Sequence, residues 1–173
     1  MVVINLDMCN NESIKLDRGN NMIKYFRHKK LKKILQIELD SEFSYALLQY
    51  LEKQCSKKYD PTNLNEYQKT LYLCIWLEDF SISDGILTFI NDVYCDYHNE
   101  IVLALRSIGA VKSSNIIRDA INILPADGEC FLKTSTQELR EKMRKLDQEF
   151  CSYPDGKLCS LYRKYVVKYF NEL

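Results

Sequence analysis

The sequence predicts an all-α fold, arranged as a single compact domain of about eight helices over residues 1–173. Only five glycines and three prolines occur among the 173 residues, too few for the frequent turns of a many-stranded fold. Every long periodic segment instead repeats its apolar residues three and four positions apart, as an amphipathic helix does. The apolar fraction of 46% and the charged fraction of 28% are ordinary for a chain that buries one core.

The N-terminal part is expected to contain a loose segment followed by two helices. Residues 1–20 are predicted to be a loosely ordered N-terminal segment. A basic helix is predicted from Met22 to Gln36. Asp40 is predicted to cap the next helix, whose apolar residues follow a helical repeat: Phe43, Ala46, Leu47, Tyr50 and Leu51.

The third helix is expected to be the centre of the fold. Asn63 and Glu66 have the spacing of a capping box, which predicts a helix from there to Phe80. Residues 71–77 read Leu-Tyr-Leu-Cys-Ile-Trp-Leu and include the only tryptophan of the chain. A helix that is apolar on most sides is buried on most sides.

Three further helices are predicted before residue 126. Ser83 is expected to cap the first of them, which carries Ile86, Leu87, Phe89, Ile90 and Val93. The second extends from about His98 to Ile108 and ends at Gly109, a favourable residue after a helix C-terminus. Ser113 is expected to cap the third, which Pro125 closes.

Two helices are predicted in the C-terminal part. Ser135 and Glu138 form a second candidate capping box, before a helix that extends to Phe150. A turn at Pro154-Asp155-Gly156 separates it from the last helix, which begins near Leu158. Connections are short throughout, and no linker divides the chain.

Charge and cysteine content indicate where the protein resides. The net charge is zero, but residues 61–130 hold 10 acidic and 4 basic residues, whereas the flanking regions are basic. Seven cysteines, an odd number without a C-x-x-C pair, do not fit a secreted disulfide framework. The first residues lack the charged and apolar regions typical of a secretory leader, and no apolar run reaches about 18 residues. These features predict a cytoplasmic protein with reduced thiols and no membrane association.

The sequence predicts no enzyme, no cofactor and no metal site. Phosphate-binding loops, zinc-protease signatures and nucleophile elbows are all missing. Cys95 and His98 lie about one helical turn apart, so a nucleophile pair is conceivable there. However, neighbouring Asp96 and Asn99 favour a turn between helices, and an acidic environment disfavours a reactive thiolate.

The central acidic residues admit two readings. They cap and solubilise helices, or they form a negative surface that binds a basic protein partner. No calcium-loop spacing occurs among them. The candidate partner-binding residues, called the acidic set below, are Glu78, Asp79, Asp84, Asp92, Asp96 and Glu100.

A basic cluster provides the alternative function. Clustered lysines and arginines on one helix neutralise nucleic-acid phosphates, although a solvated helix face is the simpler reading and no helix-turn-helix pattern accompanies them. The candidate nucleic-acid-binding residues are Lys24, Arg27, Lys29, Lys30, Lys32 and Lys33. With zero net charge, nucleic acid is the less favoured partner.

Residues 40–170 resemble a bacterial family of helical domains of unknown function, named for an acidic protein that mimics DNA. The similar segments are Tyr67-Gln68 through Trp76-Leu77-Glu78, Ser83–Ile86, Ala104–Ala110, and Leu146–Phe150. The resemblance implies an all-helical fold and a tendency to form homodimers, and less strongly that carboxylates stand in for phosphates. In the second segment the family has Asn-Gly-Gly-Phe, so Ser83 and Asp84 depart from its pattern.

Together these observations predict a non-enzymatic interaction domain that binds a protein through its acidic centre. The partner would be a DNA-binding regulator, or a toxin if the chain is an immunity or antitoxin-like factor. The resemblance adds a homodimer as a further expected assembly.

Overall fold

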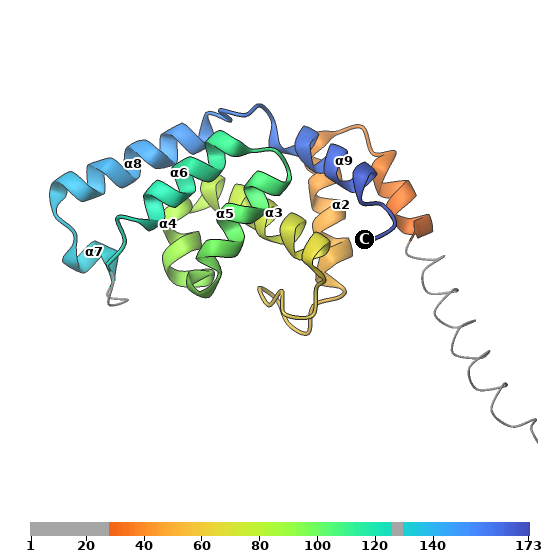
Figure 1. Cartoon of the computed structure of the whole chain (residues 1–173), viewed down its shortest axis with the longest axis horizontal. Coiled ribbons are helices and arrows are strands. Elements are labelled where there is room, and N and C mark those ends of the chain that lie inside the picture. Colours follow the sequence, from red (N-terminus) through yellow and green to blue (C-terminus); the bar gives the residue numbers. More distant parts are fainter. Residues whose placement is uncertain (1–27, 126–129) are drawn as a thin grey trace, which may run out of the picture.

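The computed structural model describes residues 28–125 and 130–173, and within them the chain is helical without strands. This confirms the predicted all-α fold. Helices in the described part are residues 28–35, α2 (Asp40–Glu52), α3 (Glu66–Ser83), α4 (Ile86–Thr88), a π-helical turn η1 (Phe89–Val93), a 3₁₀ turn η2 (Cys95–Tyr97), α5 (His98–Ser107), α6 (Val111–Ile121), α7 (Phe131–Thr134), α8 (Gln137–Cys151) and α9 (Leu158–Lys168) (Figure 1). In these described ranges every helix is too short or too polar to cross a bilayer.

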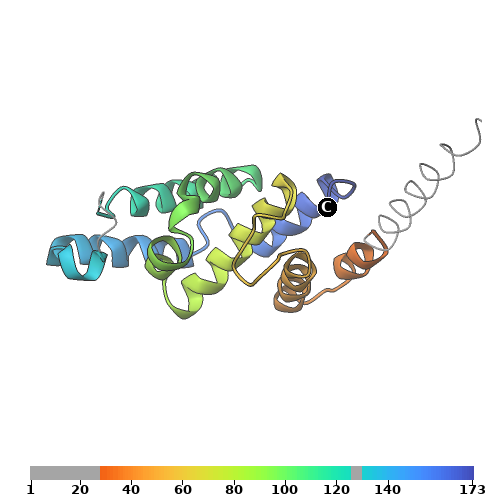
Figure 2. The same ribbon diagram turned by 90° about the horizontal axis from the view of Figure 1, so that it is seen from below.

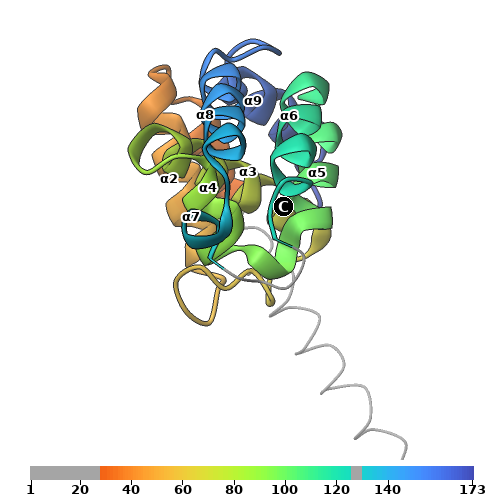
Figure 3. The ribbon, with the colours of Figure 1, turned by 90° about the vertical axis from the view of Figure 1, so that its left-hand side faces the viewer.

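Helix α3 is the centre of the packing, as its sequence predicts. Residues 71–77 are all buried, so the helix presents apolar side chains in every direction. It packs against α5 on one side and α2 on the other, with the α5–α6 pair forming a separate layer (Figure 2). Helix α8 runs alongside α6 and also contacts α3 (Figure 3).

The N-terminus of α3 has a complete capping box, two residues later than predicted. The Asn65 side chain accepts a hydrogen bond from the Gln68 backbone N–H at 2.9 Å, and the Asn65 N–H donates to Gln68 Oε1 at 3.2 Å. The predicted pair, Asn63 with Glu66, is therefore wrong. The shift arises because Asp60 first forms its own turn, accepting hydrogen bonds from the backbone N–H and hydroxyl of Thr62.

The other end of α3 also differs from the prediction. Ser83, expected to cap the following helix, is instead the last residue of α3, where its hydroxyl donates to the carbonyl of Asp79. The cap of α4 comes from α8, because Asp147 Oδ1 accepts the backbone N–H of Ile86 at 2.9 Å. Between them Gly85 has φ +85°, which a glycine adopts without strain.

The backbone of this turn accommodates the two residues that depart from the resembled pattern. Asp84, which replaces the first family glycine, has φ −127°, so its backbone conformation needs no glycine. Only Gly85 lies in the left-handed region, and it is retained. The family-like segments Ser83–Ile86 and Leu146–Phe150 thus meet in space through the hydrogen bond from Ile86 to Asp147.

The helix predicted after Ser83 is broken into short pieces. Helix α4 covers only Ile86–Thr88, and η1 widens the next turn, so that the Tyr94 N–H donates to the Phe89 carbonyl at 2.9 Å. The widened turn places Tyr94 in the core, with its ring centroid 4.6 Å from that of Phe89. The apolar residues predicted there, Ile86, Phe89 and Ile90, are buried.

The stop at Gly109 is confirmed, whereas the predicted cap at Ser113 is wrong. Gly109 has φ +92°, and the Ala110 N–H bonds the Leu105 carbonyl at 2.8 Å in a Schellman arrangement. Helix α6 then begins directly at Val111. Its first N–H groups are capped by Asp155, which accepts from Lys112 N (3.0 Å), Ser113 N (2.7 Å) and Ser113 Oγ (2.8 Å).

At the C-terminal side, the predicted capping box of Ser135 and Glu138 is wrong by one residue. Thr136 caps α8 by accepting the Leu139 N–H at 3.3 Å. Beyond α9, the buried residue Leu173 docks between α2 and α3. Its carbonyl oxygen accepts hydrogen bonds from Tyr50 Oη at 2.8 Å and Gln68 Nε2 at 3.0 Å.

We predict that Asp155→Asn destabilises the protein by about 1 kcal/mol at pH 7, a fall in Tm of about 2–4 °C, because α6 loses a charged cap. Burial acts to raise the pKa of Asp155, but hydrogen bonds from Ser113 and Lys112 outweigh it and lower the pKa. A carboxyl with a lowered pKa stabilises the fold above its unfolded pKa of about 3.9 and loses this effect as the pH falls.

The measurement is thermal unfolding followed by circular dichroism between pH 7 and pH 3. Wild type and variant should converge towards pH 3. Asp119→Asn on the exposed face of α6 is the matched control and should leave Tm nearly unchanged. An Asp155→Asn difference that is the same at both pH values would contradict the capping role.

Candidate protein-binding surface

A pocket of about 420 Å³ lies between α2, α3 and the start of α9 and is called the α2–α3 pocket here. Its lining consists of Asp40, Ser41, Ser44, Tyr45, Leu48, Ile75, Glu78, Asp79, Ile82, Tyr153, Lys157 and Cys159. Leu48 and Ile75 are core residues that form its apolar lining. Tyr45 and Ile82, which also line the pocket, are 64% and 71% exposed.

Glu78 directly follows the buried run of residues 71–77 on α3. Glu78 is half-buried. Burial raises the pKa of its carboxyl, while the nearby hydroxyls of Tyr162 and Tyr153 act in the opposite direction. The Tyr162 hydroxyl itself donates to the Cys74 carbonyl at 3.0 Å. Among the described residues no cation lies within ion-pair distance of Glu78 or of exposed Asp79. Both charges therefore lack a direct counter-ion there.

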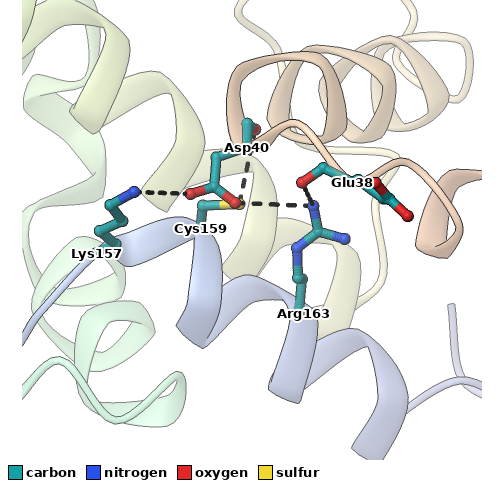
Figure 4. A network of polar contacts seen from close by, with 5 residues as sticks. All are labelled: Glu38, Asp40, Lys157, Cys159 and Arg163. Atoms are coloured by element: carbon teal, nitrogen blue, oxygen red, sulfur yellow. Dashed lines mark hydrogen bonds and ion pairs between the residues drawn. The ribbon is translucent and has the colours of Figure 1, made fainter.

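Asp40, which also lines the pocket, is in contrast paired with cations (Figure 4). Its carboxylate lies 3.2 Å from Lys157 Nζ, 3.8 Å from an Arg163 nitrogen and 3.3 Å from the Cys159 sulfur. Hydrogen bonds from Cys159 and Lys157 lower the pKa of Asp40. The sequence assigned Asp40 to capping, but it is the first residue of α2 and Leu39 holds the cap position. Its carboxylate instead joins α2 to α9.

The acidic set is distributed over three places in the structure. Glu78 and Asp79 line the α2–α3 pocket. Asp84 lines a smaller pocket of about 210 Å³ between the α3–α4 turn and α8. The remaining members are exposed and line neither pocket: Asp92 on η1, Asp96 on η2 and Glu100 in the first turn of α5. Their role in partner binding stays a prediction.

The pocket residues that sequence reasoning missed include two exposed apolar side chains, Tyr45 and Ile82. Both are apolar residues on the solvent side of otherwise well-packed helices. An apolar residue outside the buried stripe of a helix is the sequence feature that could have indicated them. Tyr45 falls outside the apolar stripe formed by Phe43, Leu47 and Tyr50, so the helical repeat itself marks it as exposed.

The described part of the basic cluster lies on one exposed helix face. Lys29, Lys30, Lys32 and Lys33 are exposed on residues 28–35, while Leu31 and Ile34 face the core. Lys24 and Arg27 lie outside the described residues. Burial, together with the nearby charge of Lys53, lowers the pKa of Lys30. Nucleic-acid binding by this face stays a prediction.

Cys95 and His98 do not form a nucleophile pair in the described structure. Cys95 is exposed on η2, which confirms the expected turn between helices. His98 Nε2 lies 2.7 Å from the Ile90 carbonyl and must donate to it, since a carbonyl only accepts. Residues 28–125 and 130–173 contain no group of three or more His, Cys, Asp or Glu side chains placed to hold a metal ion.

We predict that Glu78→Gln raises Tm at pH 7 by about 1–3 °C, because an amide avoids the cost of burying a charge. The raised pKa of Glu78 means that the folded state binds this proton more tightly than the unfolded state. Wild type therefore becomes more stable relative to Glu78→Gln as the pH falls through the folded pKa of Glu78, and the Tm difference between the two shrinks.

Thermal unfolding at pH 7 and at about pH 4.5 shows whether the ionised Glu78 carboxylate destabilises or stabilises the fold. Asp79→Asn, one residue along α3 and exposed, is the control and should change Tm little. A lower Tm for Glu78→Gln at pH 7 would show that the ionised carboxylate supports the fold rather than burdening it.

Comparison with known proteins gives the family of the chain. A sequence model described as DMP19-like protein matches residues 62–169, from the loop before α3 to the residue after α9. Helix α2 lies outside the match, so the similarity is shorter than the expected range of 40–170. No significant match is found among curated proteins or among solved structures. The match covers more than half of the sequence, and the chain belongs to the DMP19-like protein family.

Proposed function

We propose that this chain is a non-enzymatic interaction domain that binds a protein partner through its acidic central surface. Two observations support it best. Neither Glu78 nor Asp79 has a cation within 4 Å among the described residues, and Tyr45 and Ile82 beside them are exposed. Aromatic and aliphatic anchors supply most of the binding energy at protein interfaces. Carboxylates beside them select a basic partner and speed its approach.

Family membership agrees with a role in protein interaction. Carboxylates that stand in for phosphates would suit a DNA-binding regulator, whose nucleic-acid site is basic. In this chain the acidic surplus is confined to the central region, since the net charge of the whole sequence is zero. We therefore propose that the acidic region is complementary in charge to a basic site on a DNA-binding regulator. If the chain has an immunity role, the partner is instead a toxin.

The proposal includes a cytoplasmic, bacterial setting and a homodimer. The cysteines in the described part are free thiols, as is usual in a reducing compartment: Cys55, Cys74, Cys95, Cys130, Cys151 and Cys159. The bacterial setting and the dimer are carried over from the family likeness. Size-exclusion chromatography with light scattering tests the dimer directly.

We predict that charge reversal in the acidic set weakens the complex. A partner is isolated by affinity purification from cells that produce the chain, identified, purified and mixed with it again. The triple variant Asp84→Lys, Asp92→Lys and Asp96→Lys should raise the Kd at low salt about tenfold or more, since like charges then face each other. These side chains are exposed, so the fold should persist.

The control is Glu149→Lys, an exposed charge reversal on α8. It should change the Kd little, and wild-type affinity should fall as salt screens the interface. Wild-type affinity in both the triple variant and Asp79→Asn would overturn the acidic surface as the binding site, because Asp79 belongs to the pair on which the proposal rests.

A further inference from the structure

The α2–α3 pocket has two chemically different parts. Leu48 and Ile75 form an apolar lining, and Tyr45 and Ile82 extend it to the surface. Glu78, an acidic residue, also lines the pocket. Lysine and arginine have the same two-part character, with an aliphatic stem that packs on apolar surface and a cation at its end. The volume of about 420 Å³ lies within the range of pockets that enclose a small ligand.

The charges in the pocket are unequally satisfied. Asp40 already has Lys157 and Arg163 within 4 Å, so Lys157, the cation among the lining residues, is engaged. Glu78 has no such partner in the described part of the chain, and the carboxylates of Asp40 and Asp79 add to the negative potential around it. Lys58 acts on Asp79 from outside the pocket. An incoming cation would offset the cost of desolvating Glu78.

We propose that the α2–α3 pocket binds a lysine or arginine side chain from a basic segment of a protein partner. In this arrangement Glu78 pairs with the cation, and Tyr45 and Ile82 cover its aliphatic stem. The assignment rests on the proposed function and names the chemistry of the partner at one position. It also involves α2, which lies outside the segment matched by the family.

A pair of short peptides tests the assignment without knowledge of the natural partner. The probes are acetyl-Ala-Leu-Arg-Leu-Ala-amide and the same peptide with citrulline, which has nearly the same shape but no charge. Binding is followed by methyl chemical shifts of Leu48, Ile75 and Ile82. The arginine peptide should shift these methyls and bind about fivefold or more tightly than the citrulline peptide.

Two variants extend the test. Glu78→Gln should remove the preference for arginine over citrulline, and Ile82→Ser should weaken both peptides by about fivefold. Leu103→Ser is the matched control, because Leu103 is 59% exposed on α5 and does not line the pocket. Glu78 is half-buried and Ile82 is exposed, so both substitutions should leave the packed core intact. Circular dichroism checks that each variant is folded.

Several outcomes would overturn the assignment. Equal binding of the two peptides would make the pocket an uncharged apolar groove. Shifts of the pocket methyls with protein concentration alone would identify a second copy as the occupant. No shift at about 5 mM peptide would exclude even weak binding.

The natural complex separates this inference from the proposed function. If the triple charge reversal disrupts the complex while Glu78→Gln and Ile82→Ser bind normally, the acidic surface stands and the pocket assignment fails. If the arginine peptide binds in the pocket but no protein partner is captured, the pocket assignment stands and the proposed function fails.

Discussion

The burial of α3 on all sides is the constraint on which the rest of the structure depends. Residues 71–77 are buried without interruption, so α2, α5 and α8 must enclose the helix. The run ends at Glu78, which is half-buried, and the next residue, Asp79, is exposed. The candidate binding surface thus begins where this uninterrupted run ends, while Phe80 and Ser81 still face the core. The same helix supplies both the packing and two of the charges that we assign to recognition.

Three aspartates connect elements that are distant in sequence. Asp147 caps α4 from α8, Asp155 caps α6 from the loop before α9, and Asp40 joins α2 to α9. Each satisfies backbone or cationic groups that would otherwise face solvent or remain unpaired. These contacts order the C-terminal part of the chain around the central helices. The contacts of Asp40 with α9 neutralise its charge. Glu78 therefore remains the half-buried carboxylate of the pocket without a counter-ion in the described part.

The helical repeats predicted the positions of the helices well, whereas the residues that cap the helix N-termini were predicted poorly. Apolar spacing depends on local sequence, so α2, α3, α5 and α9 were found near their observed positions. Caps at Ser83 and Ser113 were wrong because the true capping groups, Asp147 and Asp155, lie about 60 and 40 residues further along the chain. The pocket was not predicted for the same reason, because α2, α3 and the start of α9, which line it, are distant in sequence.

Side-chain footprinting of the complex with its purified partner tests the central claim most directly. Hydroxyl radicals label exposed aromatic and aliphatic side chains, so a bound partner protects those that it covers. The account predicts protection of Tyr45 and Ile82, while Leu103 on α5 and Val167 on α9, which are similarly exposed, react as in the free protein. Unchanged labelling of Tyr45 and Ile82, with protection elsewhere, would contradict it.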